Sequence, residues 1–212
     1  MIQRCDGVYN CVDKSDETAC KIISLDTFSY RKEQPPSVSN KLKDEVKVTI
    51  SFEIFKISKF REVEHSFNIK FLMKVKWFDN RLTFQNLKSN IFKNVIGVAQ
   101  KHLVWIPPLI FNNSEDTTTL SMNSKGTDEQ LVNLLVQRGP KNKYDVAKSS
   151  FLDETYFYKG EENYMVLTTE YNMMLHCNYK LESYPFDTQK CSMEVSDNAH
   201  LNYISNIYIY IF

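Results

Sequence analysis

The alternation of apolar and polar residues along the chain predicts long β-strands. In residues 46–54 polar side chains separate the apolar ones, which are Val46, Val48, Ile50, Phe52 and Ile54. A period of two is typical of a strand that buries one face. The sequence therefore predicts a half-buried strand in this segment.

Two further segments alternate in the same way. Residues 67–77 bury every second side chain in this interpretation, and Leu72 is the one apolar residue on the polar face. Residues 165–175 form a third run that leads into Cys177. Several strands without strong helical periodicity predict an all-β fold with two sheets packed as a sandwich.

The segments between these strands are less regular. Residues 21–44, with the sequence "EQPPSVSNK" near their end, predict a polar linker. The stretch "DEQLVNLLVQ", residues 128–137, is interpreted as a short helix that begins near Asp128. Each of these predictions can be compared with the structure.

Composition narrows the class of protein. The 212 residues allow one ordinary domain with a small attachment. Lys and Arg total 26, as do Asp and Glu, so no global field favours nucleic acid or an anionic membrane. No apolar run approaches the roughly 20 residues that span a bilayer, and the first residues lack the apolar core of a signal peptide.

The stretch "CNYKLESYPFDTQKC" places thirteen residues between Cys177 and Cys191. A disulfide here ties neighbouring strands together and stabilises the fold by roughly 3 kcal/mol. Residues 184–187, Tyr-Pro-Phe-Asp, then form an apolar, turn-forming tip suited to docking. The alternative is a closed hairpin with no role beyond stability.

These residues resemble the signature loop of the Cys-loop receptors, the pentameric ligand-gated ion channels. The match includes the tip and the following x-Gln-x-Cys, and its tip residues are Tyr184, Pro185, Phe186 and Asp187. Two other stretches agree in order: "WFDNRL" at 77–82, and "VWIPPLIFNN" at 104–113, where Pro108 replaces the family's Asp. The resemblance implies an immunoglobulin-like β-sandwich of the channel extracellular domain over residues 45–200.

The resemblance also implies roles for single residues. The structural signature consists of Trp77, Asp79, Arg81, Trp105 and Pro107. We expect Trp77 to be buried and Asp79 to pair with Arg81 or brace a turn, in preference to contacting a ligand. Leu72 and Lys74 lie on the strand that in the family lines the complementary side of the ligand site, and the alternative for them is simple solvent exposure.

In the family, five domains form a ring, small neurotransmitter-like ligands bind between neighbours, and the loop tip transmits gating to a membrane domain. The sequence departs from this pattern after Cys191, where no aromatic residue precedes Tyr203. Residues 201–212 are interpreted as a divergent tail, and the membrane helices are missing from the chain. We therefore expect a truncated channel subunit; the alternatives are a secreted pore-less binding protein of the same fold and a non-functional product.

The first 20 residues carry a second resemblance, to the C-terminal half of a low-density-lipoprotein-receptor class A repeat. The matching stretch is "RCDGVYNCVDKSDETAC", with Asn10 in place of an Asp. The resemblance implies a Cys5–Cys20 disulfide and leaves Cys11 without its partner. Oxygen ligands suit calcium, and the candidates are Asp6, Val8, Asn10, Asp16 and Glu17. The alternative is a solvated acidic turn.

The remaining signals are weaker. Asn112-Asn113-Ser114 is a glycosylation acceptor triplet at Asn112. The sequence contains no phosphate-binding loop, nucleophile elbow or pair of catalytic acids. We therefore do not expect an enzyme. Both resemblances are to oxidised, extracellular modules, so we expect the domain on the outer face of the plasma membrane, with other subunits and a small ligand as partners.

Overall fold

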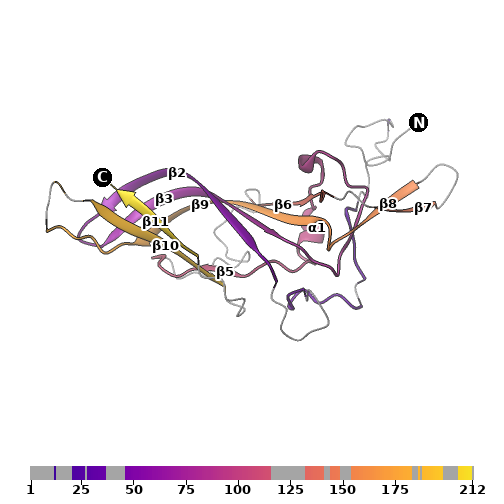
Figure 1. The fold of residues 1–212 in the computed structure, drawn as a ribbon, viewed down its shortest axis with the longest axis horizontal. Helices are drawn as coiled ribbons and strands as arrows, with labels where there is room; N and C mark the ends of the chain where they lie inside the picture. The colour runs from indigo at the N-terminus through magenta and orange to yellow at the C-terminus, as the bar shows by residue number, and fades with distance from the viewer. Residues whose placement is uncertain are drawn as a thin grey trace. The chain divides into compact units, whose positions relative to one another are not determined.

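The computed structural model describes residues 12, 21–26, 28–36, 46–115, 132–140, 144–148, 154–182, 186, 188–197 and 205–211. Strands dominate these residues (Figure 1), which confirms the all-β prediction. The strands are β1 (Ile23–Ser24), β2 (Thr49–Arg61), β3 (Ser66–Trp77), β4 (Thr83–Gln85), β5 (Leu109–Phe111), β6 (Val132–Gln137), β7 (Asp145–Lys148), β8 (Glu154–Lys159), β9 (Tyr164–His176), β10 (Gln189–Asp197) and β11 (Ser205–Ile211). Two single turns of helix, η1 (Ile91–Lys93) and α1 (Val98–Lys101), complete the set.

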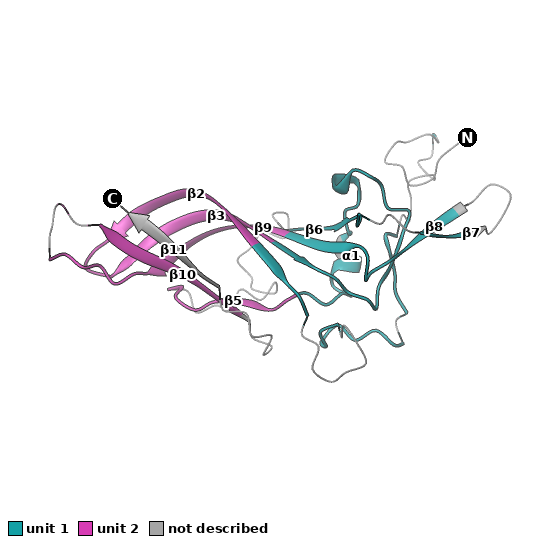
Figure 2. Cartoon of the chain, viewed as in Figure 1, with its two compact units in different colours: residues 1–50, 75–106, 133–167 teal, residues 51–74, 107–132, 168–212 magenta. Residues whose placement is uncertain are grey.

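The strands form three sheets. Their orders are β1-β4-β8-β7, β11-β10-β5 and β2-β3-β9-β6. The chain divides into two compact units (Figure 2). Unit 1 comprises residues 1–50, 75–106 and 133–167, and unit 2 comprises residues 51–74, 107–132 and 168–212.

Unit 2 contains a sandwich core of aromatic rings. Phe71 on β3 and Tyr171 on β9 lie with ring centroids 5.3 Å apart. Phe111 on β5, a strand of a different sheet, contacts Phe71 at 5.6 Å and Tyr171 at 5.4 Å. These three rings therefore join two sheets face to face, as the predicted sandwich requires.

The alternation predicted for β3 and β9 is confirmed. All six apolar-face positions of each run are buried, namely Phe67, Ile69, Phe71, Met73, Val75 and Trp77 on β3, and Met165, Leu167, Thr169, Tyr171, Met173 and Leu175 on β9. On β2 the strand itself is confirmed, but its far half does not bury the predicted face. Ile54 is 41% exposed, because β2 is the outer strand of its sheet.

The helix predicted for residues 128–137 is wrong, since residues 132–137 form strand β6. Leu134, Leu135 and Val136 are all buried. The backbone of β6 also bonds to residues 94–96, with Ile96 N donating to Leu134 O at 2.8 Å. A strand buried on both faces presents a continuous apolar run, which periodicity cannot separate from a buried helix.

The segments predicted as a linker and as a divergent tail also contain strands. In the described part of the predicted linker, residues 21–26 and 28–36, Ile23 is buried and belongs to β1, which pairs with β4. Most of the predicted divergent tail forms β11, which pairs antiparallel with β10 along its whole length. The residues of β1 and β11 do not by themselves indicate strands, because each strand forms only by pairing with a strand distant in the sequence.

Candidate functional site

The loop closed by Cys177 and Cys191 is the centre of the candidate site. A disulfide joins these residues, with their Cα atoms 5.2 Å apart, which confirms the predicted loop closure. Cys177 directly follows β9 and Cys191 lies within β10, so the bond links strands of two different sheets in unit 2. Both residues are buried, which fixes the base of the loop in the core.

The loop presents an apolar residue at its tip. Phe186 is 92% exposed, whereas Tyr184, Pro185 and Asp187 lie outside the described residues. At the base, Lys180 N donates to Gln189 Oε1 and Gln189 Nε2 donates to Lys180 O, both at 2.9 Å. This reciprocal pair holds the two arms of the loop together at its base.

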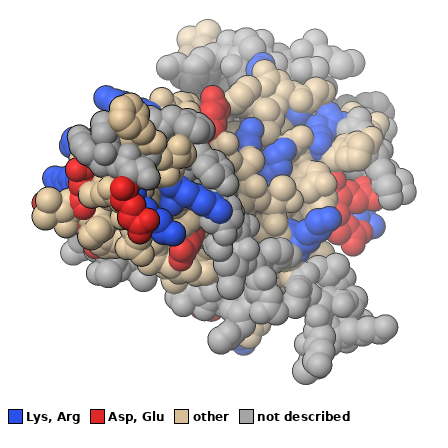
Figure 3. Space-filling model, turned by 60° about the vertical axis from the view of Figure 1, so that its left-hand side comes forward, with Lys and Arg blue, Asp and Glu red and all other residues tan. Residues whose placement is uncertain are grey.

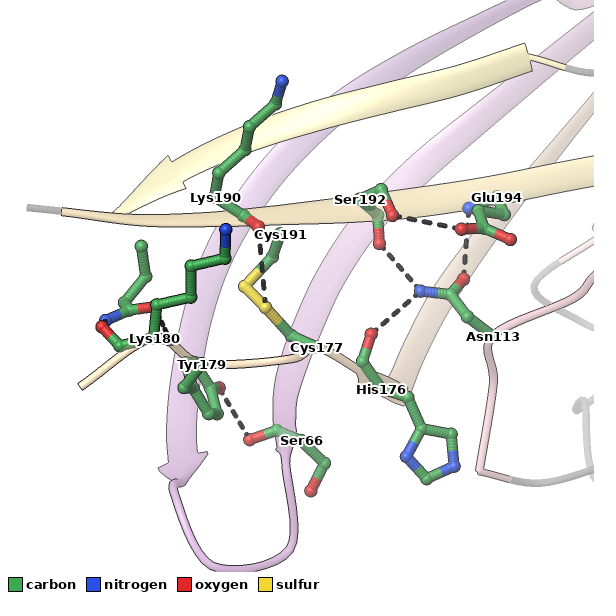
Figure 4. Close-up of a disulfide and its surroundings, with 11 residues drawn as sticks. Ser66, Asn113, His176, Cys177, Tyr179, Lys180, Lys190, Cys191, Ser192 and Glu194 are labelled. Atoms are coloured by element: carbon green, nitrogen blue, oxygen red, sulfur yellow. Dashed lines mark hydrogen bonds between the residues drawn. A yellow bond between two sulfur atoms is a disulfide. The ribbon is translucent and has the colours of Figure 1, made fainter. Parts of the chain in front are cut away.

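The side chain of Asn113 forms hydrogen bonds with the last residue of β9 and with two residues of β10 (Figure 4). Its Nδ2 donates to His176 O at 3.0 Å and to Ser192 O at 2.8 Å. Its Oδ1 accepts from Glu194 N at 3.1 Å. The sequence offered no sign of this role, because Asn113 was only the middle residue of a glycosylation triplet and its partners are more than 60 positions away.

The turn between β2 and β3, residues 62–65, contacts the first residues of the loop. Cys177 N donates to His65 O at 2.7 Å. Tyr179 Oη donates to Ser66 O at 2.9 Å (Figure 4), and the Tyr179 and His65 rings stack with centroids 6.4 Å apart. Burial, and to a smaller extent the Glu62 carboxylate, raises the pKa of Tyr179. Sequence reasoning missed these contacts as well.

The predicted ligand-facing positions lie on the outer face of β3. Leu72 is half-buried and Lys74 is exposed. Two residues before Leu72, Lys70 Nζ pairs with Glu170 Oε1 of β9 at 2.6 Å. Within the described residues Lys74 has no ion pair, so its ammonium group is available to an anionic group from outside. On the face drawn in Figure 3 basic and acidic side chains are interspersed, in keeping with the zero net charge.

The predicted signature residues assemble a network in unit 1. Trp77 and Trp105 are buried and meet edge to face at 6.3 Å. Arg81 Nε and Nη2 donate to Asp79 Oδ1 and Oδ2 at 2.8 and 2.7 Å, so the predicted pairing is present. Asp79 is fully buried, and a bidentate pair in such a place braces the chain rather than facing a ligand.

Tyr30 completes this network, although it lies in the predicted linker. Its hydroxyl donates to Asp79 Oδ2 at 2.9 Å and accepts from Trp105 N at 2.8 Å. The Arg81 guanidinium lies 4.5 Å from the centre of its ring. Burial raises the pKa of Tyr30 far above its ordinary value. Close packing continues at Gly160, where an added Cβ would lie 1.9 Å from Asp79 O.

Of the other predicted site residues, the structure describes Pro107 and Asn112. Pro107 is buried, and Asn112 is exposed, with its Oδ1 accepting from Ser196 Oγ at 2.7 Å. Within the part of the chain that the structure describes, no group of His, Cys, Asp or Glu is suited to hold a metal ion. The predicted calcium ligands and the Cys5–Cys20 pair lie outside the described residues, so these stay predictions.

Comparison with known proteins identifies the family. The profile of the neurotransmitter-gated ion-channel ligand binding domain matches residues 21–208. The chain belongs to this family. The described strands agree with the β-sandwich of that domain, and the disulfide loop lies where the signature predicted it.

The chain is also similar to one individual protein of known name, at low sequence identity. The chain is 24% identical to the pH-sensitive chloride channel 2 of Drosophila melanogaster over 192 residues, which cover 87% of this chain. The chain spans 31% of the relative's length. The helices found among the described residues are too short to cross a membrane.

Proposed function

We infer that this chain is the extracellular ligand-recognition domain of a pentameric ligand-gated ion channel subunit. The observation that carries the proposal is the disulfide loop of unit 2, whose exposed Phe186 projects from a base fixed by Cys177 and Cys191. A restrained loop with an apolar tip transmits a displacement of its sheets to whatever its tip contacts. Residues 184–187 would in this way couple ligand binding to a pore in the membrane.

The ligand would bind between neighbouring subunits, and the outer face of β3 would form one wall of its site. Leu72 offers an apolar surface, and Lys74, four residues after the paired Lys70, offers an ammonium group without an ion pair among the described residues. This arrangement suits a small molecule with an apolar part and an anionic group.

The relative suggests both the conducted ion and a regulator. Because that protein is named a pH-sensitive chloride channel, we propose that the complete subunit conducts chloride and responds to pH. We further propose that residues 1–20 form part of a class A repeat that binds calcium through Asp6, Val8, Asn10, Asp16 and Glu17, on the extracellular side.

A chimeric channel tests this function. Residues 21–211 are joined to the part of the Drosophila chloride channel that lies beyond the matched domain. Currents are recorded under voltage clamp while pH and a panel of small carboxylates and amino acids are varied. We expect a chloride current gated by at least one of these stimuli. Phe186→Ala should reduce the maximal current without lowering the amount of protein at the cell surface.

Matched variants separate binding from coupling. Lys74→Ala should raise the half-maximal ligand concentration roughly tenfold or more, as for a lost charge-assisted contact, whereas Lys56→Ala, an exposed lysine on β2, should leave it unchanged. A chimera that reaches the surface but never conducts would contradict the channel function. Ligand binding by the secreted chain would then favour a pore-less binding protein.

A further inference from the structure

The glycosylation triplet Asn112-Asn113-Ser114 directly follows β5 in unit 2, and its first residue is exposed. Side chains alternate in direction along an extended chain. Phe111, the last residue of β5, is buried and its ring contacts that of Phe71 in the core. Asn112 therefore points to the opposite side of the chain, away from this core and toward solvent.

The hydrogen bonds of Asn112 leave its side-chain nitrogen open to solvent. The main-chain N donates to Glu194 O at 2.9 Å, and the side-chain Oδ1 accepts from Ser196 Oγ at 2.7 Å. Within the described residues no hydrogen bond involves Nδ2 of Asn112. Both bonds to β10 thus use atoms other than Nδ2, so a group attached to this nitrogen would leave both bonds in place.

The neighbouring Asn113 differs in each of these respects. Its Nδ2 donates to His176 O and Ser192 O, and its Oδ1 accepts from Glu194 N. The acceptor triplet requires Ser or Thr two positions after the asparagine and any residue but Pro between them. In the whole sequence Asn112 is the one asparagine that meets this requirement. The sequence and the structure therefore agree on a single acceptor atom, the Nδ2 of Asn112.

We propose that Asn112 carries an N-linked glycan, and that no neighbouring subunit covers the end of β5 in the assembled receptor. In this step a bond forms between Asn112 Nδ2 and the first sugar of a lipid diphosphate-linked oligosaccharide. The bond between that sugar and the diphosphate breaks, the lipid diphosphate leaves, and one amide proton passes to solvent. The proposal rests on the proposed function for the extracellular placement of the domain. Because a glycan is bulky and hydrophilic, it belongs on a surface and not in a packed interface.

The first test needs no channel activity. The complete 212-residue chain is fused to a cleavable secretion signal, produced in insect cells, and purified from the medium and from the secretory membranes. Its intact mass is measured before and after treatment with an endoglycosidase that removes N-linked glycans. We expect a mass above the 24.9 kDa of the polypeptide, which the enzyme lowers in a single step because the sequence offers one acceptor.

Matched variants identify the acceptor. Asn112→Gln and Ser114→Ala should each abolish the excess mass, because the first removes the acceptor amide and the second removes the hydroxyl that the triplet requires. Ser196→Ala removes the hydrogen bond to Asn112 but leaves the triplet intact, so this control should keep the glycan. An unaltered chain with the polypeptide mass alone, or excess mass that persists in Asn112→Gln, would overturn the proposal. If a variant does not fold, enzyme treatment and peptide mapping of the unaltered chain give the same decision.

The second test uses the chimeric channel and asks whether the end of β5 is a free surface. Intact cells that display the chimera are treated with the endoglycosidase without denaturant. We expect the enzyme to remove the glycan as completely as it does from the denatured chimera. A glycan that is released only after denaturation would overturn the proposal that no subunit covers this surface.

The same chimera keeps this proposal distinguishable from the proposed function. A conducting chimera without a glycan on Asn112 would overturn the modification site and leave the channel function standing. A chimera that carries the glycan and reaches the cell surface but never conducts would contradict the channel function and leave the modification site standing.

Discussion

The two units stabilise their characteristic features by different means. In unit 1, Asp79 is fully buried and is held by Arg81 and Tyr30, so polar bonds fix the chain from within. In unit 2, a disulfide and the side chain of Asn113 fix the base of a loop whose tip is exposed. The first arrangement buries the Asp79 carboxylate, and the second leaves the Phe186 ring exposed. We therefore interpret the unit 1 network as a brace and the unit 2 loop as a contact element.

The ion pairs of the two units show the same contrast. Asp79 and Arg81 form a bidentate pair with no exposure of the carboxylate, whereas Lys70 and Glu170 form a half-exposed pair across β3 and β9. Removing one partner of a buried pair leaves an uncompensated buried charge, while an exposed charge returns to water. Similar distances therefore do not imply similar contributions to stability.

The largest expected effect breaks the buried pair. Asp79→Ala should lower the free energy of unfolding by about 4 kcal/mol, because Arg81 and Tyr30 both lose the carboxylate to which they donate. Glu170→Ala, the matched change in the half-exposed pair, should lower the free energy of unfolding by less than about 1 kcal/mol. Urea unfolding followed by circular dichroism measures both. If the two variants lost similar amounts of unfolding free energy, the distinction between the buried pair of Asp79 and the pair of Lys70 and Glu170 would be contradicted.

A smaller effect is expected from opening the loop. Replacing both Cys177 and Cys191 with Ser should lower the free energy of unfolding by about 3 kcal/mol, since the unfolded chain regains the freedom that loop closure removes. Phe186→Ala should leave it within about 0.5 kcal/mol, because an exposed side chain contributes little to stability. If Phe186→Ala were as destabilising as the double variant, the loop tip would be part of the core and not a contact element.

The smallest effect concerns pH. Burial raises the pKa of Tyr171 in unit 2 to about 12. The unfolded chain loses this phenol proton near pH 10 while the folded chain keeps it, so the contribution is complete below about pH 10 and is lost as pH rises toward about 12. The loss should reach roughly 2 kcal/mol.

Tyr171→Phe isolates this contribution, since Phe keeps the ring and cannot ionise. Urea unfolding at about pH 8 and about pH 11, on either side of the ordinary phenol pKa, should show that the unaltered chain loses more stability between the two than the variant does. An equal loss in both chains would mean that the phenol of Tyr171 is not protected from ionisation in the folded state.

The local pattern of the chain accounts for much of the fold and part of the site. Alternation placed β3 and β9 and their buried faces, because side chains of a strand point to opposite sides whatever their partners. It failed at β6, where burial on both faces hides the period, and at β1 and β11, which are short or isolated and depend on pairing with β4 and β10. The disulfide of Cys177 and Cys191 and the pairing of Asp79 with Arg81 followed from spacing and motif.

The sequence by itself determined strands β3 and β9 with their buried faces, the disulfide loop with Phe186 near its tip, and the family, since these depend on residues close together in the chain. Only the tertiary structure decided which distant groups complete each feature. Tyr30 reaches Asp79 from 49 positions away, Asn113 reaches Ser192 from 79, and Tyr179 reaches Ser66 from 113. Such contacts form when sheets stack and strands pair, and a hydrogen bond between remote residues leaves no periodic or compositional trace in the sequence that encodes it.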